Sequence, residues 1–279
     1  MANKEAFGLR WLLEKCSVYP NAFYNFLKQR KAKYQLKKTH ILAQIEEIYH
    51  SHNGVDGYRK MKIYLQRRYI NLSLPTVHKY MNGDLQLQAV VRRKKPAYQK
   101  SSGHKVFPDL LQRDFTAESK NKKWATDFTY LYLKDGSVHY NCTIIDLYDR
   151  SVVASITDSK MTTSLAVRTL KEALSRQKGK LSGLILHSDQ GSQFSAREFT
   201  SFCSSVGVIQ SMSQAGCPYD NSPMERFFNT LKSELIYLFD FHSKEQLYKS
   251  VEEFAYVFYN HVRPHSFNNY LTPFQKRYF

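Results

Sequence analysis

The chain has 279 residues, and its 41 Lys and Arg against 24 Asp and Glu give a formal net charge of +17 and a pI of about 9.6. This length is enough for two or three domains with hydrophobic cores of their own. The four cysteines are scattered and form no Cys-x-x-Cys pair, which argues against a disulfide framework and a zinc knuckle. No apolar run approaches the length of a membrane span, and the first residues lack a signal-peptide core. We therefore expect a soluble protein, cytoplasmic in a bacterium.

The positive charge is concentrated in the front part of the chain. Residues 1–116 carry 22 basic and 8 acidic side chains, a net charge of +14, whereas residues 117–279 carry a net charge of +3. Such an excess favours non-specific contact with a polyanion and carries no information about sequence preference. The front part is the expected nucleic-acid-holding region. The alternative is a basic surface that only keeps the protein in solution.

Helical patterns dominate this front part. Residues 1–35 predict short helical pieces, and three helices follow that begin near Thr39, near Gly57 and after Ser73. Gly83 is the expected stop of the last one. Three short basic helices of this size indicate a helix-turn-helix module over residues 36–95, whose last helix would enter the major groove of DNA.

The alternative for this module is a basic three-helix bundle that does not read bases. After it, the basic run that precedes Pro96 reads as a linker that follows a DNA backbone or stays solvated. The candidate DNA contacts of the front part are Arg59, Lys60, His78, Lys79, Arg92, Arg93, Lys94 and Lys95.

From Lys123 the periodicity changes to that of strands. Three β-rich runs, Trp124–Leu133, Val138–Asp146 and Ser151–Thr157, are separated by hairpin-like breaks and predict an antiparallel meander. A helix is expected at about residues 162–177, because apolar residues recur there at helical spacing.

The remaining elements complete an α/β pattern. A short buried strand at Leu184–Leu186, a helix at Ala196–Val206 and a strand at Ile209–Met212 lead to a long helix that starts at Ser222. The order β-β-β-α-β-α-β-α predicts a ribonuclease-H-like fold, with a mixed five-stranded sheet and helices on both faces. In such a sheet the first and fourth strands are expected to be neighbours.

Three carboxylates stand in distinctive surroundings at the ends of these elements. Asp127 lies in Trp-Ala-Thr-Asp-Phe-Thr, Asp189 in His-Ser-Asp-Gln-Gly, and Glu225 in Asp-Asn-Ser-Pro-Met-Glu, with 35 residues between the last two. Two divalent cations held by several carboxylates can activate an attacking oxygen and stabilise a leaving oxygen in phosphodiester transfer. Mg²⁺ prefers hard oxygen ligands of this kind. The pattern therefore predicts an active site that cuts and joins DNA.

Each acid also has a structural alternative. Asp127 could end a strand, although an acid is a poor strand former within an aromatic and β-branched run. Asp189 could belong to an ordinary turn. Glu225 has the strongest competitor, because Ser222-Pro-Met-Glu225 matches a capping box in which the Glu only satisfies the start of a helix.

Residues beside the acids are expected to support them. His187 either positions the acid loop or fills space, and Gly191 should let the backbone turn sharply beside Asp189. The supporting candidates are Trp124, His187, Gly191 and Asn221.

Two further basic residues are candidate DNA contacts. Lys232 follows Glu225 by two helical turns on the same face, and it should reach a DNA phosphate unless that face is merely solvated. Arg263 contacts DNA or pairs with an acid, and the sequence leaves both open.

Several motifs together resemble one family. The resemblance spans nearly the whole chain and rests on the three acid motifs, Gly57-Tyr-Arg59, Leu111-Gln-Arg-Asp-Phe115, Tyr259-Asn260 and Arg263-Pro-His265. On these motifs the chain resembles the integrase-type transposases encoded by the second reading frame of bacterial insertion sequences of family three, within the retroviral-integrase superfamily. It departs from the family pattern at Phe194, where Tyr is frequent, and at Ala154-Ser155, where Gly-Trp is common.

The resemblance implies a ribonuclease-H-type fold and a Mg²⁺-dependent DDE site at Asp127, Asp189 and Glu225, in which Mn²⁺ can substitute. It implies cleavage and strand transfer at the ends of an element. The implied partners are double-stranded DNA, as terminal repeats and as target, and further copies of the chain assembled on it, at the nucleoid and away from membranes. Because the upstream frame usually supplies a helix-turn-helix and a coiled coil, its product is a further expected partner.

The expected domains are an N-terminal helical segment at 1–35, the helix-turn-helix-like module at 36–95, a linker at 96–116, the catalytic core at 117–240 and a helical extension at 241–279. Other functions make different demands. A ribonuclease H would cut a hybrid without joining, a DNA-binding regulator with an inactive core would never cleave, and a glycosidase would need two opposed carboxylates and no metal.

Overall fold

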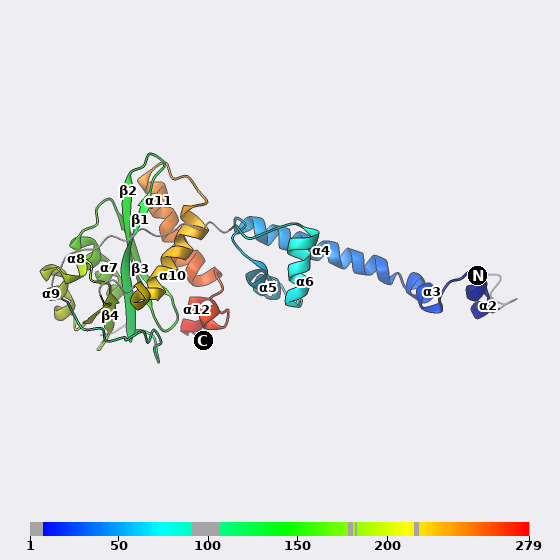
Figure 1. Ribbon diagram of the computed structural model, residues 1–279, viewed down its shortest axis with the longest axis horizontal. Coiled ribbons are helices and arrows are strands. Elements are labelled where there is room, and N and C mark those ends of the chain that lie inside the picture. The colour runs from blue at the N-terminus through cyan, green and yellow to red at the C-terminus, as the bar shows by residue number, and fades with distance from the viewer. Residues whose placement is uncertain (1–7, 91–105, 178–180, 182, 215–217, 279) are drawn as a thin grey trace. The chain divides into compact units, whose positions relative to one another are not determined.

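The computed structural model describes residues 8–90, 106–177, 181, 183–214 and 218–278 (Figure 1). Its contacts divide the chain into two compact units, the first ending at Val90 and the second beginning at Val91. Within the described ranges, no helix is both long and apolar enough to cross a lipid bilayer.

The first unit is helical. Its elements are α2 (Leu9–Lys15), α3 (Pro20–Leu27), α4 (Arg30–Ser51), α5 (Tyr58–Arg67), α6 (Leu74–His78) and the π-helix η1 (Lys79–Asp84). The helix α4 begins at Arg30 rather than near Thr39, because Lys, Ala, Gln and Leu favour helix even where no face is buried. The expected start of α6 is confirmed: the hydroxyl of Ser73 accepts a hydrogen bond from the backbone N–H of Thr76.

The core of this unit forms where α4, α5 and α6 meet. Its largest buried side chains include Ile45, Met61, Leu65 and Met81. The long apolar residues recur at three- and four-residue spacing, so each helix turns one stripe inward.

A buried carboxylate lies at the turn between α4 and α5. Asp56 is 0% exposed, accepts a hydrogen bond of 2.6 Å from His52 Nδ1 and lies 3.2 Å from Lys60 Nζ. Burial by itself raises the pKa of Asp56, but the hydrogen bond from His52 and the charge of Lys60 outweigh it, and the pKa lies below its ordinary value. His52 and Lys60 stand four residues before and after Asp56, so neighbours in the sequence compensate the buried charge of this turn.

The second unit contains a five-stranded mixed sheet (Figure 1). Its strands are β1 (Lys123–Tyr132), β2 (Val138–Asp146), β3 (Val152–Asp158), β4 (Ile185–Ser188) and β5 (Ile209–Met212). The spatial order is β3-β2-β1-β4-β5, with β1, β2 and β3 antiparallel and with β4 and β5 parallel to β1. The predicted ribonuclease-H-like sheet, with its first and fourth strands as neighbours, is confirmed.

Helices cover both faces of the sheet (Figure 1). One face packs against α7 (Thr163–Ser175), the short α8 (Ser192–Ser195) and α9 (Arg197–Ser205). The other packs against α10 (Ser222–Leu231), α11 (Lys244–Glu252) and the π-helix η4 (Glu253–Val262). Shorter elements are the 3-10 helices η2 (Pro218–Asn221) and η5 (Ser266–Asn268), the π-helix η3 (Lys232–Ile236) and α12 (Pro273–Tyr278).

The alternation of side chains along β1 decides which face carries the first acid. Trp124 and Phe128 pack on the α7 side, whereas Ala125 and Leu131 pack on the α10 side. Successive strand residues point to opposite faces, so Asp127 shares the α10 side with Ala125. The carboxylate therefore faces the helix that carries Glu225.

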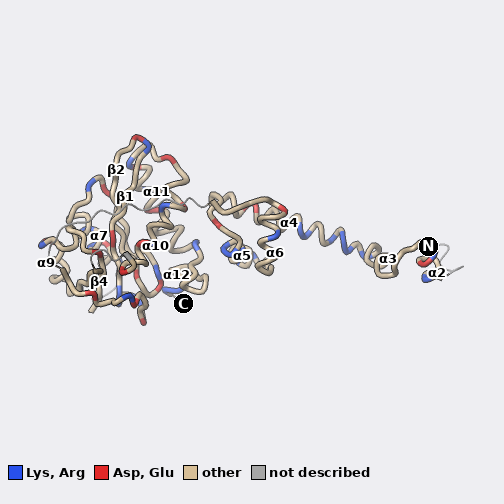
Figure 2. Tube along the Cα trace, viewed as in Figure 1, with Lys and Arg blue, Asp and Glu red and all other residues tan. Residues whose placement is uncertain are grey.

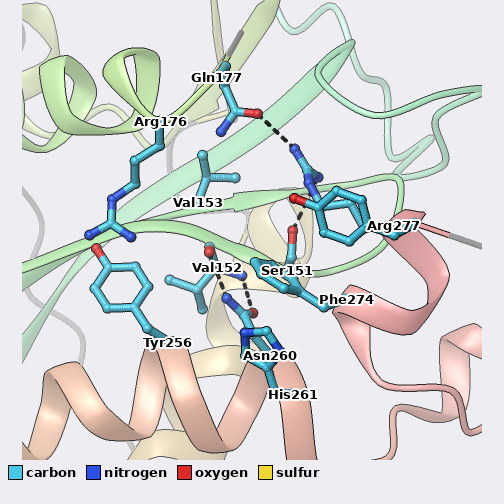
Figure 3. A pocket seen from close by; sticks show the side chains of 11 residues that line it. Ser151, Val152, Val153, Arg176, Gln177, Tyr256, Asn260, His261, Phe274 and Arg277 are labelled. Atoms are coloured by element: carbon cyan, nitrogen blue, oxygen red, sulfur yellow. Dashed lines mark hydrogen bonds between the residues drawn. The ribbon is translucent and has the colours of Figure 1, made fainter.

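The end of the chain is fastened to the edge strand β3. Asn260 Oδ1 accepts a 2.8 Å hydrogen bond from the backbone N–H of Val152, and its Nδ2 donates to the Val152 carbonyl at 3.0 Å. The guanidinium of Arg277 is buried and donates to Asp146 at 2.9 Å and to Asp149 at 2.7 Å. Figure 3 shows Asn260 and Arg277 beside a cavity of ≈ 270 Å³, which none of the three candidate acids lines. Residues beyond 240 thus share the core of the sheet.

Candidate active site

Strand register brings the first two candidate acids to the same level. In the parallel pairing of β1 with β4, Ala125 lies opposite His187. Asp127 is two residues beyond Ala125 and Asp189 is two residues beyond His187, just past the end of β4. Parallel strands run in the same direction, so the two carboxylates reach the same edge of the sheet.

The third candidate acid belongs to the first turn of α10. That helix packs through Met224 and Phe227 against the face to which Asp127 points. Lys232 lies two turns further on, where α10 passes into η3. The predicted meeting of three distant segments therefore rests on one parallel strand pair and one helix packed across it.

Electrostatics link these side chains. Burial, then the charge of Asp189 and then that of Glu225, raise the pKa of Asp127 well above its ordinary value. The backbone N–H of Phe128 and the charge of Lys232 oppose this rise. The charge of Lys232 thus acts on Asp127, whereas its contact with a DNA phosphate stays a prediction.

Asp189 shows a similar imbalance. Burial raises its pKa, while a backbone hydrogen bond from Gly191 and the neighbouring His187 act in the opposite direction. Asp127, Asp189 and Glu225 are all half-buried, so the group is open to solvent. Among the residues that the structure describes, no three Asp, Glu, His or Cys side chains stand close enough to coordinate one metal ion. The charges of Asp189 and Glu225 thus affect the pKa of Asp127, although the three side chains do not form a complete coordination site.

Backbone N–H groups fix both aspartates. Asp127 Oδ1 accepts a 2.7 Å hydrogen bond from Phe128 N, and Asp189 Oδ1 accepts a 3.0 Å bond from Gly191 N. The backbone bends at Gln190, directly before Gly191, but the Gly191 φ of −59° is open to any residue. Glycine is needed there for room: a Cβ would lie 2.8 Å from Asp189 Oδ1.

The start of α10 rules out the capping alternative for Glu225. The N-cap residue is Asn221, Ser222 is already helical, and no side chain caps this helix. The reason is that η2 runs directly into α10, which leaves no extended Ser residue before the helix. Asn221 instead donates from Nδ2 to the carbonyl of Thr126 at 3.3 Å, next to Asp127. Its Oδ1 is buried without a hydrogen-bond partner among the described residues.

The remaining supporting candidates are buried. His187 is 0% exposed and forms hydrogen bonds at both ring nitrogens, 2.9 Å from Ser211 Oγ and 2.9 Å from the Asp220 carbonyl oxygen. Burial lowers the pKa of His187, against the opposing effect of its hydrogen bond to the Asp220 carbonyl. Trp124 lies wholly inside the core on the α7 side, away from Asp127.

The candidate DNA contacts of the first unit differ in how they are engaged. In Figure 2, Lys and Arg positions, coloured blue on the Cα trace, recur along α4 and near α5. Arg59, His78 and Lys79 are exposed, whereas Lys60 is half-buried and paired with Asp56. Arg92, Arg93, Lys94 and Lys95 lie outside the described residues.

Arg263 takes the second of its two alternatives. Its Nε and Nη2 donate to the two carboxylate oxygens of Glu234, each at 2.8 Å, and the guanidinium lies over the ring of Tyr259. Contact of Arg263 with DNA stays a prediction.

Sequence reasoning missed one ion pair near the acids. Arg113 Nε donates to Asp220 Oδ1 at 2.7 Å, although the two residues are 107 positions apart. Arg113 lies within the Leu111–Phe115 motif, which was a signal for its importance but not for its partner. Ser211, the partner of His187, had no signal of its own.

Comparison with protein families identifies both units. Models of the integrase core domain match residues 117–218 and residues 206–273, and a model of an HTH-like domain matches residues 36–95.

Curated relatives extend the match along the whole chain. The transposase InsK for insertion sequence element IS150 of Escherichia coli is 31% identical over 276 residues, which cover 98% of this chain and 95% of that protein. The chain belongs to the insertion-sequence transposases of the IS3 family. The transposase for insertion sequence element IS904 of Lactococcus lactis is 30% identical over 88% of this chain and 97% of that protein. The enzyme is thus a transposase, a polynucleotidyl transferase with an integrase core.

Solved structures that are similar to this chain include a viral intasome and an integrase catalytic core domain. The simian T-cell lymphotropic virus intasome structure has a TM-score of 0.48 at 17% identity and covers 85% of this chain and 74% of that chain. The HTLV-2 integrase catalytic core domain, solved in complex with magnesium, has a TM-score of 0.46 at 20% identity over 58% of this chain and 99% of that chain.

Proposed function

We propose that the transposase holds divalent cations with Asp127, Asp189 and Glu225, and that it cleaves and joins the ends of its insertion element there. The observation that carries the proposal is the electrostatic interaction among three carboxylates, which lie on β1, just past the end of β4 and on α10. Burial, and then the charges of Asp189 and Glu225, raise the pKa of Asp127.

The donor set fits a hard divalent cation. Three carboxylates supply the oxygen ligands that Mg²⁺ prefers, and Mn²⁺ takes similar ligands. The buried Asn221 Oδ1, which has no hydrogen-bond partner in the described part of the chain, is one more oxygen beside Asp127. When bound, two divalent cations would activate the attacking oxygen and stabilise the leaving oxygen.

The chain's own residues prepare the reaction. Backbone N–H groups of Phe128 and Gly191 orient the two aspartates, and Lys232 adds a positive charge that suits a DNA phosphate. Water would first attack phosphorus in line and free a 3′-hydroxyl at the element end. That hydroxyl would then attack a second phosphodiester and displace its 3′-oxygen, without a covalent bond between protein and DNA.

DNA binding by the first unit fits the same function. The exposed Arg59, His78 and Lys79 are the proposed contacts there, with Lys60, Arg92, Arg93, Lys94, Lys95, Lys232 and Arg263 as further candidates. We further propose that the working form is an oligomer on terminal-repeat and target DNA at the bacterial nucleoid, and that the upstream-frame product is a partner. The similarity to transposases supports these proposals.

The test is a reaction of the purified chain with labelled duplex that carries the element end, in the presence of target DNA. Cleaved 3′-hydroxyl ends and joined products should form with Mg²⁺ or Mn²⁺, whereas Ca²⁺ should support binding alone. Parallel reactions add the upstream-frame product. Cleavage that persists in EDTA would overturn the metal proposal. Hydrolysis of an RNA–DNA hybrid without joining would indicate a ribonuclease, and binding without cleavage would indicate a regulator.

A further inference from the structure

Residues 106–115 lie between the regions matched by the HTH-like and integrase core models, and they belong to neither. The sequence predicts a linker here, but the segment is packed against the core. Leu111 is 2% exposed in the cluster on the α10 side, and Phe107 packs against the cluster on the α7 side. The Pro108 carbonyl accepts a 3.3 Å hydrogen bond from Met212 at the end of β5.

A chain of hydrogen bonds runs from this segment to the turn before α10. Leu110 N donates to Ser211 Oγ at 2.9 Å, and Ser211 Oγ lies 2.9 Å from His187 Nδ1. His187 Nε2 lies 2.9 Å from the Asp220 carbonyl oxygen. A carbonyl can only accept, so Nε2 carries the proton, and Nδ1 accepts from the Ser211 hydroxyl. The direction of every bond in the chain is thereby fixed.

An ion pair links Asp220 back to the segment. Together with the hydrogen bonds above it forms a closed circuit of contacts through Leu110, Ser211, His187, Asp220 and Arg113. Arg113 Nε donates to Asp220 Oδ1 at 2.7 Å, and Asp220 Oδ2 accepts from Gln214 N at 3.2 Å. The Asp220 side chain is 4% exposed, whereas that of Arg113 is 61% exposed. The hydrogen bond from Arg113 is the main reason why the pKa of Asp220 lies below its ordinary value.

The backbone of the segment is held in a costly conformation. Gln112 has φ 46° and Arg113 has φ 65°, in the left-handed region that residues with a Cβ rarely occupy. Asp109 Oδ1 fixes the preceding turn by accepting from Leu111 N and Gln112 N, each at 3.0 Å. Such conformations persist where the surroundings determine them, and they gather at functional sites.

The circuit touches every element that carries an acid. His187 stands two residues before Asp189 on β4. Asp220 is followed by Asn221, the N-cap residue of α10, which carries Glu225. The Asn221 side chain donates a hydrogen bond to the Thr126 carbonyl, next to Asp127 in β1. A shift of the turn at Asp220 would therefore move Glu225 relative to both aspartates.

We propose that residues 107–113 are part of the active site, and that Arg113 and His187 are positioning residues that hold the elements of Asp189 and Glu225 at the spacing required for divalent cations. This inference rests on the proposed function. Groups that orient metal ligands typically contribute about 10- to 100-fold to metal affinity or activity. Arg113 is the better residue to test, because its mostly exposed side chain leaves no cavity when replaced.

The experiment compares full-length Arg113→Met, Asp220→Asn and the double variant with the parent. Mn²⁺ binding is followed by calorimetry and by the Mn²⁺-induced rise in unfolding temperature, and cleavage is measured against Mn²⁺ concentration. DNA affinity is measured in Ca²⁺. Each variant should need about 10- to 100-fold more Mn²⁺ for half-saturation and for half-maximal cleavage, with unchanged DNA affinity. The double variant, which leaves no unpaired charge, should match the more severe single variant because the two residues act together.

Two further variants separate positioning from plain structure. Arg113→Lys keeps the charge and should recover part of the Mn²⁺ affinity. Asp114→Asn breaks the neighbouring ion pair with Lys123, 2.7 Å long, without touching the circuit, and its Mn²⁺ curve should match the parent's.

Two outcomes would overturn the inference. In the first, Arg113→Met and the double variant titrate Mn²⁺ like the parent. In the second, the loss of cleavage follows a fall in metal-free unfolding temperature and DNA affinity, with Mn²⁺ half-saturation unchanged. If the parent itself neither binds Mn²⁺ nor cleaves, the proposed function fails instead.

Discussion

Two aspartates, the buried Asp56 of the helical unit and the half-buried Asp127 of the sheet, have opposite electrostatic surroundings. Asp56 in the helical unit has His52 and Lys60 as neighbours, which lower its pKa despite its burial. Asp127 in the sheet has Asp189 and Glu225 nearby, which together with burial raise its pKa, and Lys232 offsets this only in part. The charge of Asp56 is thus compensated by side chains of its own unit. For Asp127, the proposed divalent cations would supply that compensation.

The largest expected effect comes from removing the charges of the second group. Asp127→Asn, Asp189→Asn and Glu225→Gln should each lower cleavage and strand transfer by more than about 100-fold, the upper end of what is lost when only a supporting residue is removed. DNA binding, measured in Ca²⁺, should stay near that of the parent. If one of these variants stays active, its residue does not belong to the site, and it no longer differs in role from Asp56.

The next effect comes from removing the cation that pairs with two buried aspartates. Arg277→Met leaves Asp146 and Asp149 buried without their cation, so the free energy of unfolding of the second unit should fall by about 3–5 kcal/mol. Denaturant unfolding followed by tryptophan fluorescence measures this change, because Trp124 lies in that core. Adding Asp146→Asn to the variant should recover part of the loss. A stable Arg277→Met protein would show that paired acids can be buried here at no cost.

Asp56→Asn tests the compensated aspartate. Loss of its charge-assisted hydrogen bonds should cost the first unit about 1.5–3 kcal/mol at neutral pH. Because the pKa of Asp56 in the folded state is below the unfolded value of 3.8, its contribution is present above pH 3.8 and is lost as pH falls through the folded pKa. Unfolding of the parent and the variant should therefore converge in acid. A difference that persists at the lowest pH would assign the effect to packing.

Asp127→Asn should have the opposite sign in the metal-free protein. The folded state disfavours the ionised carboxylate, so its removal should stabilise the metal-free protein at neutral pH. The same variant should lose the rise in unfolding temperature that Mg²⁺ gives the parent. A destabilised metal-free variant would place Asp127 with Asp56 as a structural residue.

The smallest effect concerns the cations of the helical unit. Lys79 is exposed, so Lys79→Ala should weaken DNA binding a few-fold for all sequences and flatten the slope of log K against log salt by about 1. Titrations at several salt concentrations measure the slope. A loss confined to element-end DNA would indicate base contact instead.

Periodicity predicts much of this molecule. The three antiparallel strands and the helix after Thr162 follow from apolar spacing, and β5 has the predicted bounds, Ile209–Met212. The meeting of Asp127 with Asp189 follows from the neighbourhood of β1 and β4, which the order of elements implies.

Periodicity does not predict which distant side chains pair with one another. It tells which face of an element is buried, but not that Arg113 meets Asp220 or that Arg277 meets Asp146, 131 positions away. The extension of α4 to Arg30 follows from propensity in a stretch where no face is buried. The capping motif at Ser222 misled because a local pattern does not reveal that η2 already occupies the place of the cap.

The two hydrogen bonds between the Asn260 side chain and the Val152 backbone have a consequence for chains truncated before Asn260. β3 is the edge of the sheet, and an uncovered edge offers backbone donors and acceptors to any other strand. A polypeptide that stops before Asn260 lacks the amide that occupies both groups of Val152. A chain truncated before Asn260 should therefore aggregate more readily than the parent, which light scattering would measure. The segment that carries Asn260 thus protects the edge of the sheet against pairing with other chains.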